Sequence, residues 1–274
     1  MGENLHCGGG AFEDFLISQS KVKIEYMNRY DTIELDEPSK LFEYTMSSKK
    51  FKIFENIRPL LNDDEFEIFI DKCIDINRID KNEERCLIHY VCSMGDAALQ
   101  LVQHFNEAGA DLATCRDGNY RYPIHYACYG GDNSIELVKY LVAQGADVNC
   151  SDLDWTYPLH IACGLKAPNL VKYLIENGAN VDRSDLARMY PIHYACYGGD
   201  DSLQVVKLLV EYDIAVIYQE NFKKLPIHIA CMGGNGSIEL VKYLVANGAK
   251  LDQYAKQIVD STSCAWLLYD YIHD

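Results

Sequence analysis

The sequence predicts an all-α solenoid of stacked helix-loop-helix units, joined by β-hairpin-like turns and closed by helical caps. Two observations carry this prediction. A seven-residue segment, Tyr122-Pro-Ile-His-Tyr-Ala-Cys128 in its clearest form, recurs about every 35 residues. Each copy is followed by a longer apolar segment with helical spacing and then by a turn. Apolar residues make up 49% of the chain, which is ample for a packed core.

The repeated segment occurs in four strong copies and one weaker copy. The strong copies span residues 122–128, 157–163, 190–196 and 225–231, and the weaker copy spans 86–92. Their histidines are His89, His125, His160, His193 and His228, with separations of 36, 35, 33 and 35 residues. A fixed period of this length is typical of architectures in which each unit stacks on the next.

Each unit is expected to contain a short helix, a loop, a longer helix and a turn. Pro123 stands at the start of the first helix, where its missing N–H costs nothing. The second helix is predicted over 135–142, because apolar residues recur there at intervals of three and four. Gly145 then suits a left-handed C-cap. In the fourth unit Asp213 replaces this glycine, so we expect an altered turn there.

These units resemble the ankyrin repeat, whose signature is Thr-Pro-Leu-His-x-Ala at a period near 33 residues. Five copies keep phase over residues 82–252, which we identify as five ankyrin repeats. The resemblance implies that each histidine forms hydrogen bonds within its turn and that each cysteine is a small buried apolar residue. The signature threonine is replaced by Tyr122, Tyr157, Tyr190 and Leu225.

The two ends of the chain depart from the repeat. Residues 38–81 are predicted to form a degenerate N-terminal capping repeat, because Phe51, Phe54 and Ile57 keep helical spacing while the histidine segment is missing. Residues 253–274 are predicted to form a C-terminal capping helix or half repeat. Residues 1–37 alternate apolar and polar residues in a way that is compatible with a hairpin, and no role is assigned to them.

Charge and composition exclude several classes of protein. Acidic residues outnumber basic ones by 41 to 25, which gives a net charge of −16 and argues against binding to nucleic acid or to anionic membranes. No apolar run approaches the roughly 18 residues of a membrane span, and the N-terminus lacks the layout of a signal peptide. With 11 cysteines and no such leader, we expect reduced thiols and an intracellular location, cytoplasmic or nuclear.

The His-x-x-Cys pattern within each repeat suggests two kinds of chemistry. Residues three apart on a helix share a face, and zinc sites use both residue types. Structural zinc needs four convergent ligands, however, whereas stacked repeats spread these pairs in a row. Nucleophilic catalysis needs one activated thiolate with a base, and five equivalent pairs in core positions indicate a scaffold. We predict no cofactor, metal or catalytic residue, and a metal-binding or enzymatic use of these positions is one alternative.

The resemblance implies recognition through the turn tips and the concave face of the first helices. The usual tip glycine is replaced by Tyr120, Trp155, Arg188 and Lys223. Aromatic residues, methionine and arginine are enriched at protein interfaces. The candidate partner-binding residues are Tyr120, Arg121, Tyr129, Trp155, Leu165, Arg188, Met189, Tyr197, Phe222, Lys223 and Met232.

The predicted function is therefore non-catalytic binding of another protein. Trp155 is the preferred anchor, because an indole presents about 150–250 Å² of surface. Two alternatives remain open. In one, the chain is the ankyrin part of a larger scaffold, ligase-adaptor or channel assembly. In the other, Trp155 packs on its own hairpin while Tyr129 and Tyr197 stack with each other along the groove.

Overall fold

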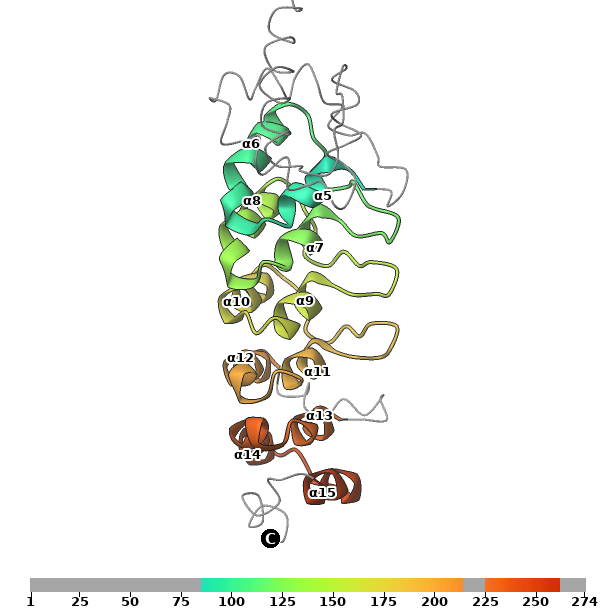
Figure 1. Cartoon of the computed structure of the whole chain (residues 1–274), viewed down its shortest axis with the longest axis vertical. Helices are drawn as coiled ribbons and strands as arrows, with labels where there is room; N and C mark the ends of the chain where they lie inside the picture. Colours follow the sequence, from blue (N-terminus) through green and yellow to red (C-terminus); the bar gives the residue numbers. More distant parts are fainter. Residues whose placement is uncertain (1–84, 214–224, 262–274) are drawn as a thin grey trace, which may run out of the picture. The chain divides into compact units, whose positions relative to one another are not determined.

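A computed structural model describes residues 85–213 and 225–261 of the chain. These residues form two layers of helices, with hairpin turns projecting from one side (Figure 1). The described ranges contain no β-strand, and the predicted all-α solenoid is confirmed. The segments 1–37 and 38–81, for which a hairpin and a capping repeat are predicted, lie outside the described residues.

The inner layer consists of short helices that begin at the repeated segment. In four of them a proline occupies the first helical turn, as the sequence predicts. Each inner helix packs against the next along the stack. They are α5 (Leu87–Cys92), α7 (Pro123–Cys128), α9 (Pro158–Gly164), α11 (Pro191–Cys196) and α13 (Pro226–Met232), and α15 (Gln253–Asp260) packs against α13.

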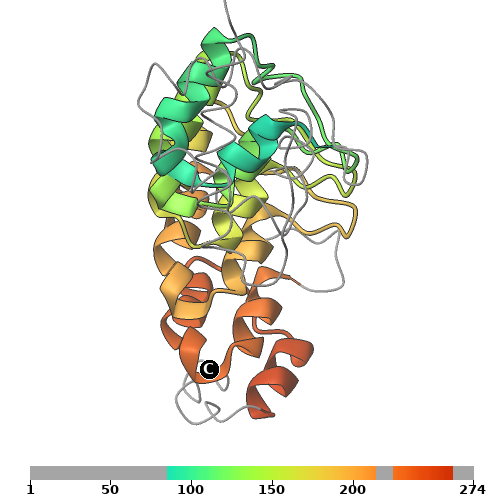
Figure 2. The ribbon, with the colours of Figure 1, turned by 45° about the horizontal axis from the view of Figure 1, so that its top comes forward.

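The outer layer consists of the longer amphipathic helices. In α8, Leu137, Val138 and Leu141 are fully buried, while Lys139 and Glu136 form an ion pair on the solvent side. Figure 2 shows the two layers from a second angle. The outer helices are α6 (Leu99–Glu107), α8 (Ile135–Ala143), α10 (Pro168–Glu176), α12 (Leu203–Tyr212) and α14 (Ile238–Ala246).

The loops between the two helices of a repeat link successive repeats. In four repeats this loop contains a 3-10 turn: η2 (Gly95–Ala98), η3 (Gly131–Ser134), η4 (Gly199–Ser202) and η6 (Gly234–Ser237). A carboxylate oxygen of Asp132 accepts a hydrogen bond from Leu170 N at 2.9 Å. It thereby satisfies one of the free N–H groups that begin the next outer helix. Asp96 and Asp200 make the same bond to the repeats that follow them.

The fourth repeat ends as the sequence predicts, without a left-handed turn. Asp213, which follows α12, has an extended backbone with φ −152° and ψ 105°. At the corresponding place Gly145 and Gly178 have φ values of 96° and 88°. An aspartate side chain disfavours that left-handed conformation, which glycine adopts without penalty. The turn after α12 is therefore altered relative to the turns before it.

A buried histidine in each inner helix joins the helix to its surroundings. The Nδ1 atom of His160 accepts a hydrogen bond from Tyr157 N at 3.1 Å, which satisfies a backbone group at the helix start. Its Nε2 atom donates to the Met189 carbonyl of the following hairpin at 3.1 Å. His125 makes the same pair of contacts, with Tyr122 N and Thr156 O. These bonds within the turn are those that the family resemblance implies, and they also connect successive repeats.

Removing one of these bridges should destabilise the fold. We expect His160→Ala to lower the free energy of unfolding by about 1–3 kcal/mol, because a buried N–H and a buried carbonyl lose their partner. Urea titration followed by circular dichroism measures the change. The control is Lys172→Ala on the outer helix α10, whose side chain is 58% exposed, and for it a change below about 0.5 kcal/mol is expected. Equal effects of the two substitutions would contradict the bridging role.

The same histidine should make stability depend on pH. Burial lowers the pKa of His160 to about 4, against about 6.5 in an unfolded chain. The unfolded chain therefore binds a proton that the folded chain excludes. The stabilisation of the fold by the neutral His160 ring is fully present above about pH 6.5 and is lost as the pH falls toward 4. Between pH 7.5 and 5, unfolding free energies from urea should fall by about 2 kcal/mol more in the wild type than in His160→Ala; equal falls would contradict a buried neutral ring.

Candidate binding surface

Three hairpins between repeats, residues 115–121, 150–156 and 183–189, share one construction. In the second, Asp152 N donates to Thr156 O, and Trp155 N donates to Asp152 O, both at 3.1 Å. The Asp152 carboxylate also accepts hydrogen bonds from the N–H groups of Asp154 and Thr156. This is a tight turn closed by one residue in the left-handed region. Asp117 and Asp185 occupy the same buried place in the other two hairpins.

The hairpins are fastened to the helices and to one another. The hydroxyl of Tyr126 donates to Asp117 at 2.6 Å, and that of Tyr194 donates to Asp185 at 2.6 Å. Along the stack, Leu153 N donates to Asn119 O and Leu186 N donates to Asp154 O. The three hairpins therefore follow one another as a continuous row (Figure 1).

Large side chains occupy the left-handed position of each hairpin. Tyr120, Trp155 and Arg188 have φ values of 60°, 57° and 60°. We call these three residues the tip row. A non-glycine residue in this conformation costs roughly 1–2 kcal/mol. All three side chains are exposed, Trp155 by 54%.

A second set of exposed apolar side chains lies at the C-terminal ends of the inner helices. Its members are 45–63% exposed, so their apolar surface remains available for contact. They belong to four successive repeats and stand at the same place in each, except that one lies a residue further along. We call them the helix-end row: Tyr129, Leu165, Tyr197 and Met232.

Two predicted partner-binding residues are placed differently. Met189 needs correction: its side chain is only 8% exposed, and its carbonyl is the acceptor for His160. It directly follows Arg188, so alternation along the hairpin turns it inward. Arg121 is half-buried, with Nε 3.5 Å from a carboxylate oxygen of Asp152, and thus connects two hairpins. Phe222 and Lys223 lie outside the described residues.

Three exposed residues join the surface without having been predicted. Leu153 and Leu186 are 47% and 56% exposed, directly after the buried aspartates of their hairpins. A leucine directly after the aspartate of each turn, Asp152 or Asp185, is the signal that could have identified them. The guanidinium of Arg116 lies 4.0 Å from the ring centre of Tyr120, which is a cation–π contact.

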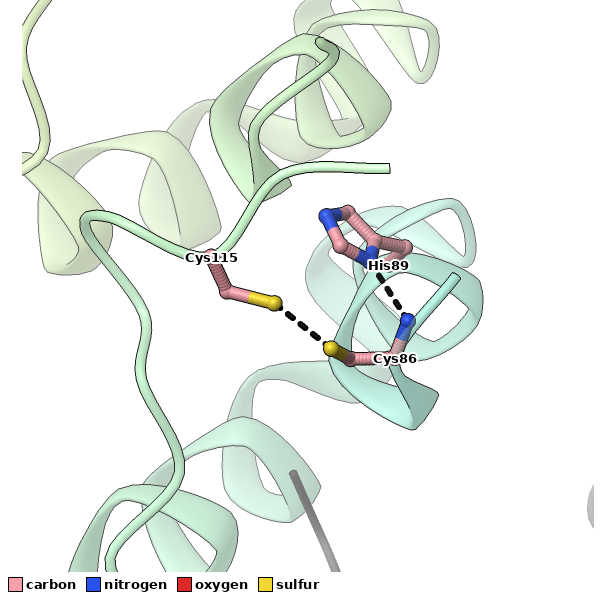
Figure 3. A group of neighbouring side chains, drawn as sticks. All are labelled: Cys86, His89 and Cys115. Carbon is pink, nitrogen blue, oxygen red and sulfur yellow. Dashed lines mark hydrogen bonds between the residues drawn. The ribbon is translucent and has the colours of Figure 1, made fainter. Parts of the chain in front are cut away.

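One group of three metal-ligating residue types occurs in the described part of the chain. It contains Cys86, His89 and Cys115, which Figure 3 shows side by side. The sequence suggested His89 with Cys92, three residues later on α5. The structure instead brings His89 close to Cys86 before the helix and to Cys115 of the first hairpin. Because Cys115 lies 29 residues from Cys86, no local pattern indicates this grouping.

Comparison with known proteins agrees with the geometry. A family model for ankyrin repeats, built of three copies, matches residues 60–152, 88–185 and 159–255. A search of curated proteins found no match to the chain. Among the helices of residues 85–213 and 225–261, none is long and apolar enough to cross a membrane.

The inner-helix cysteines should resist alkylation. The thiols of Cys92, Cys128 and Cys163 are 0% exposed, so a reagent reaches them only when the fold opens. We expect iodoacetamide to label the half-buried Cys115 and Cys150 before any of these three. Peptide mapping by mass spectrometry over a time course in native buffer measures the order. Equal labelling rates at all five positions would contradict the placement of the helix cysteines in the core.

Proposed function

Because the chain belongs to the ankyrin repeat family, we propose that it is a non-catalytic module that binds another protein through the tip row and the helix-end row. Ankyrin repeats are generally protein–protein interaction modules, and the family is typically non-enzymatic. The fold alone does not specify where a partner binds, so the argument for this surface depends on its own residues.

The observation that carries the proposal is the backbone conformation of the tip row. Tyr120, Trp155 and Arg188 each hold a left-handed φ that glycine would adopt without penalty. The hydrogen bonds that form the second hairpin come from main-chain groups and from the Asp152 carboxylate, so its turn does not need an indole. Such local strain concentrates at functional sites. Three exposed side chains kept at this cost support a role in recognition.

The chemistry of the two rows fits a protein partner. Aromatic residues, methionine and arginine are the types enriched at protein interfaces, and tryptophan, tyrosine and arginine dominate their binding energy. Trp155 is the largest of these side chains, and its exposure favours display over packing on its own hairpin. The Arg116 guanidinium lies 4.0 Å from the ring centre of Tyr120 and restricts the orientation of that ring.

The hydrogen bonds that attach the hairpins to the rest of the fold also favour binding. His125 and His160 donate hydrogen bonds to carbonyl groups of the hairpins. Leu153 N and Leu186 N link each hairpin to its predecessor. A surface that is ordered before contact loses less conformational entropy on binding. The rows therefore supply preorganised apolar contacts on a chain of net charge −16.

Replacing the tip tryptophan by glycine separates binding from folding. We expect Trp155→Gly to change the free energy of unfolding by less than about 1 kcal/mol, because relief of the left-handed strain offsets the greater freedom of glycine in the unfolded chain. The same change should weaken partner binding by about 2 kcal/mol or more. Affinity capture with quantitative mass spectrometry identifies proteins retained by the wild type and lost by the variant, and calorimetry then measures their affinity.

The matched control is Tyr212→Ala, which removes an exposed aromatic ring from the outer helix α12, away from both rows. It should retain every protein that the wild type retains. If Trp155→Gly binds as the wild type does while its unfolding free energy falls by several kcal/mol, the indole packs on its hairpin and the proposal fails.

A further inference from the structure

Two cysteines from different elements meet at the first repeat. Cys86 is the N-cap residue of α5 and is 2% exposed. Cys115 begins the first hairpin and is half-buried. Their sulfur atoms lie 2.6 Å apart and point toward each other (Figure 3).

We propose that Cys86 and Cys115 are a modification site: they form a reversible disulfide that joins the start of α5 to the first hairpin. The bond would close a loop over residues that are 29 apart in sequence. Neither cysteine belongs to the tip row or the helix-end row, so the inference does not rest on the proposed function.

The sulfur separation favours a disulfide over a shared metal ion. A disulfide bond is about 2.05 Å long. Two thiolates on a tetrahedral zinc ion, each about 2.3 Å from the metal, stand roughly 3.8 Å apart. The observed 2.6 Å is closer to the bonded pair, so the sulfurs need to move less to bond than to admit zinc.

The nearby histidine is already engaged by the backbone. His89 Nδ1 accepts a hydrogen bond from Cys86 N at 3.0 Å (Figure 3). His125 and His160 hold the equivalent N–H groups in the same way, although Tyr122 and Tyr157 stand there instead of a cysteine. The Nδ1 contact is thus part of the repeat scaffold, and a metal ion would have to displace it.

The two thiols also suit oxidation chemically. The contact with Cys115 lowers the pKa of Cys86, against the opposing effect of burial. The same contact raises the pKa of Cys115. A lowered pKa favours the thiolate of Cys86, which is the reactive form of cysteine.

With hydrogen peroxide as the oxidant, the reaction balances as follows. One sulfur attacks a peroxide oxygen, the O–O bond breaks and hydroxide leaves, which yields a sulfenic acid. The second sulfur attacks the first, the S–S bond forms and the S–O bond breaks. The proton of the remaining thiol ends on the oxygen of the sulfenic acid, which departs as water. Starting from one thiol and one thiolate, the products are the disulfide, one water and one hydroxide, and a thiol reductant reverses the bond by exchange.

The second repeat provides a matched comparison. Cys150 begins its hairpin as Cys115 begins the first, with its sulfur 3.8 Å from Nδ1 of His125. The N-cap position of that repeat is Tyr122, so no second thiol faces Cys150 there. Cys150→Ser therefore removes a hairpin cysteine in the same setting without touching the proposed pair.

The test uses the full chain. The reduced protein is treated with hydrogen peroxide, unreacted thiols are blocked with N-ethylmaleimide under denaturing conditions, and the sample is digested without reduction by a protease that cleaves after glutamate. Cleavage after Glu84, Glu107 and Glu136 places Cys86 and Cys115 in the peptides 85–107 and 108–136, which also contain Cys92 and Cys128. N-ethylmaleimide found on Cys92 and Cys128 therefore assigns the bond to Cys86 and Cys115. We expect these two peptides to be linked in the wild type and in Cys150→Ser, and separate in Cys115→Ser or after reduction.

Two results would overturn the proposal. One is a wild-type protein in which both cysteines carry N-ethylmaleimide after peroxide treatment, or in which Cys86 is linked to a different cysteine. The other is about one equivalent of zinc that the purified wild type retains through dialysis and that both Cys86→Ser and Cys115→Ser lose, because the pair would then be metal ligands.

Discussion

The arrangement of this protein depends on the buried histidines of its inner helices, which in α7 and α9 bridge to the next hairpin. In His160 one ring nitrogen satisfies the backbone at the start of its helix, and the other holds a carbonyl of the next hairpin. A single neutral imidazole thus fixes the helix start, the hairpin and the spacing between neighbours. The tip row follows from it, since a hairpin held at its base presents its end at a defined place.

The fold could be predicted from the sequence because equivalent side chains occupy the same structural positions in every repeat. Period, proline position and turn glycines all have local causes, and the departure at Asp213 could be predicted from one residue. The candidate surface was only partly predictable. Burial of Met189 depends on alternation within a hairpin, and the meeting of Cys86 with Cys115 depends on how the chain returns after a whole helix pair. The meeting of the two cysteines is a tertiary fact without a local pattern.

Strain and rigidity act together in the hairpins. A tyrosine, tryptophan or arginine keeps a left-handed backbone only if the hydrogen bonds of the turn outweigh the cost of that conformation. Asp117 and Asp185 stabilise their turns in this way. Each carboxylate accepts hydrogen bonds from a backbone N–H group and from a tyrosine hydroxyl. The same bonds explain why exposed side chains of this size can stand at fixed positions.

The construction of the hairpins has a consequence for how such a protein evolves. Each turn is closed by main-chain groups and one buried aspartate, so the residue at the tip is free to vary without altering its own support. The residues of the proposed recognition surface and the residues that hold the fold are thereby at separate positions. Duplicating a unit adds one more variable tip at a fixed interval, so the exposed surface can change by point substitution while the scaffold stays as it is.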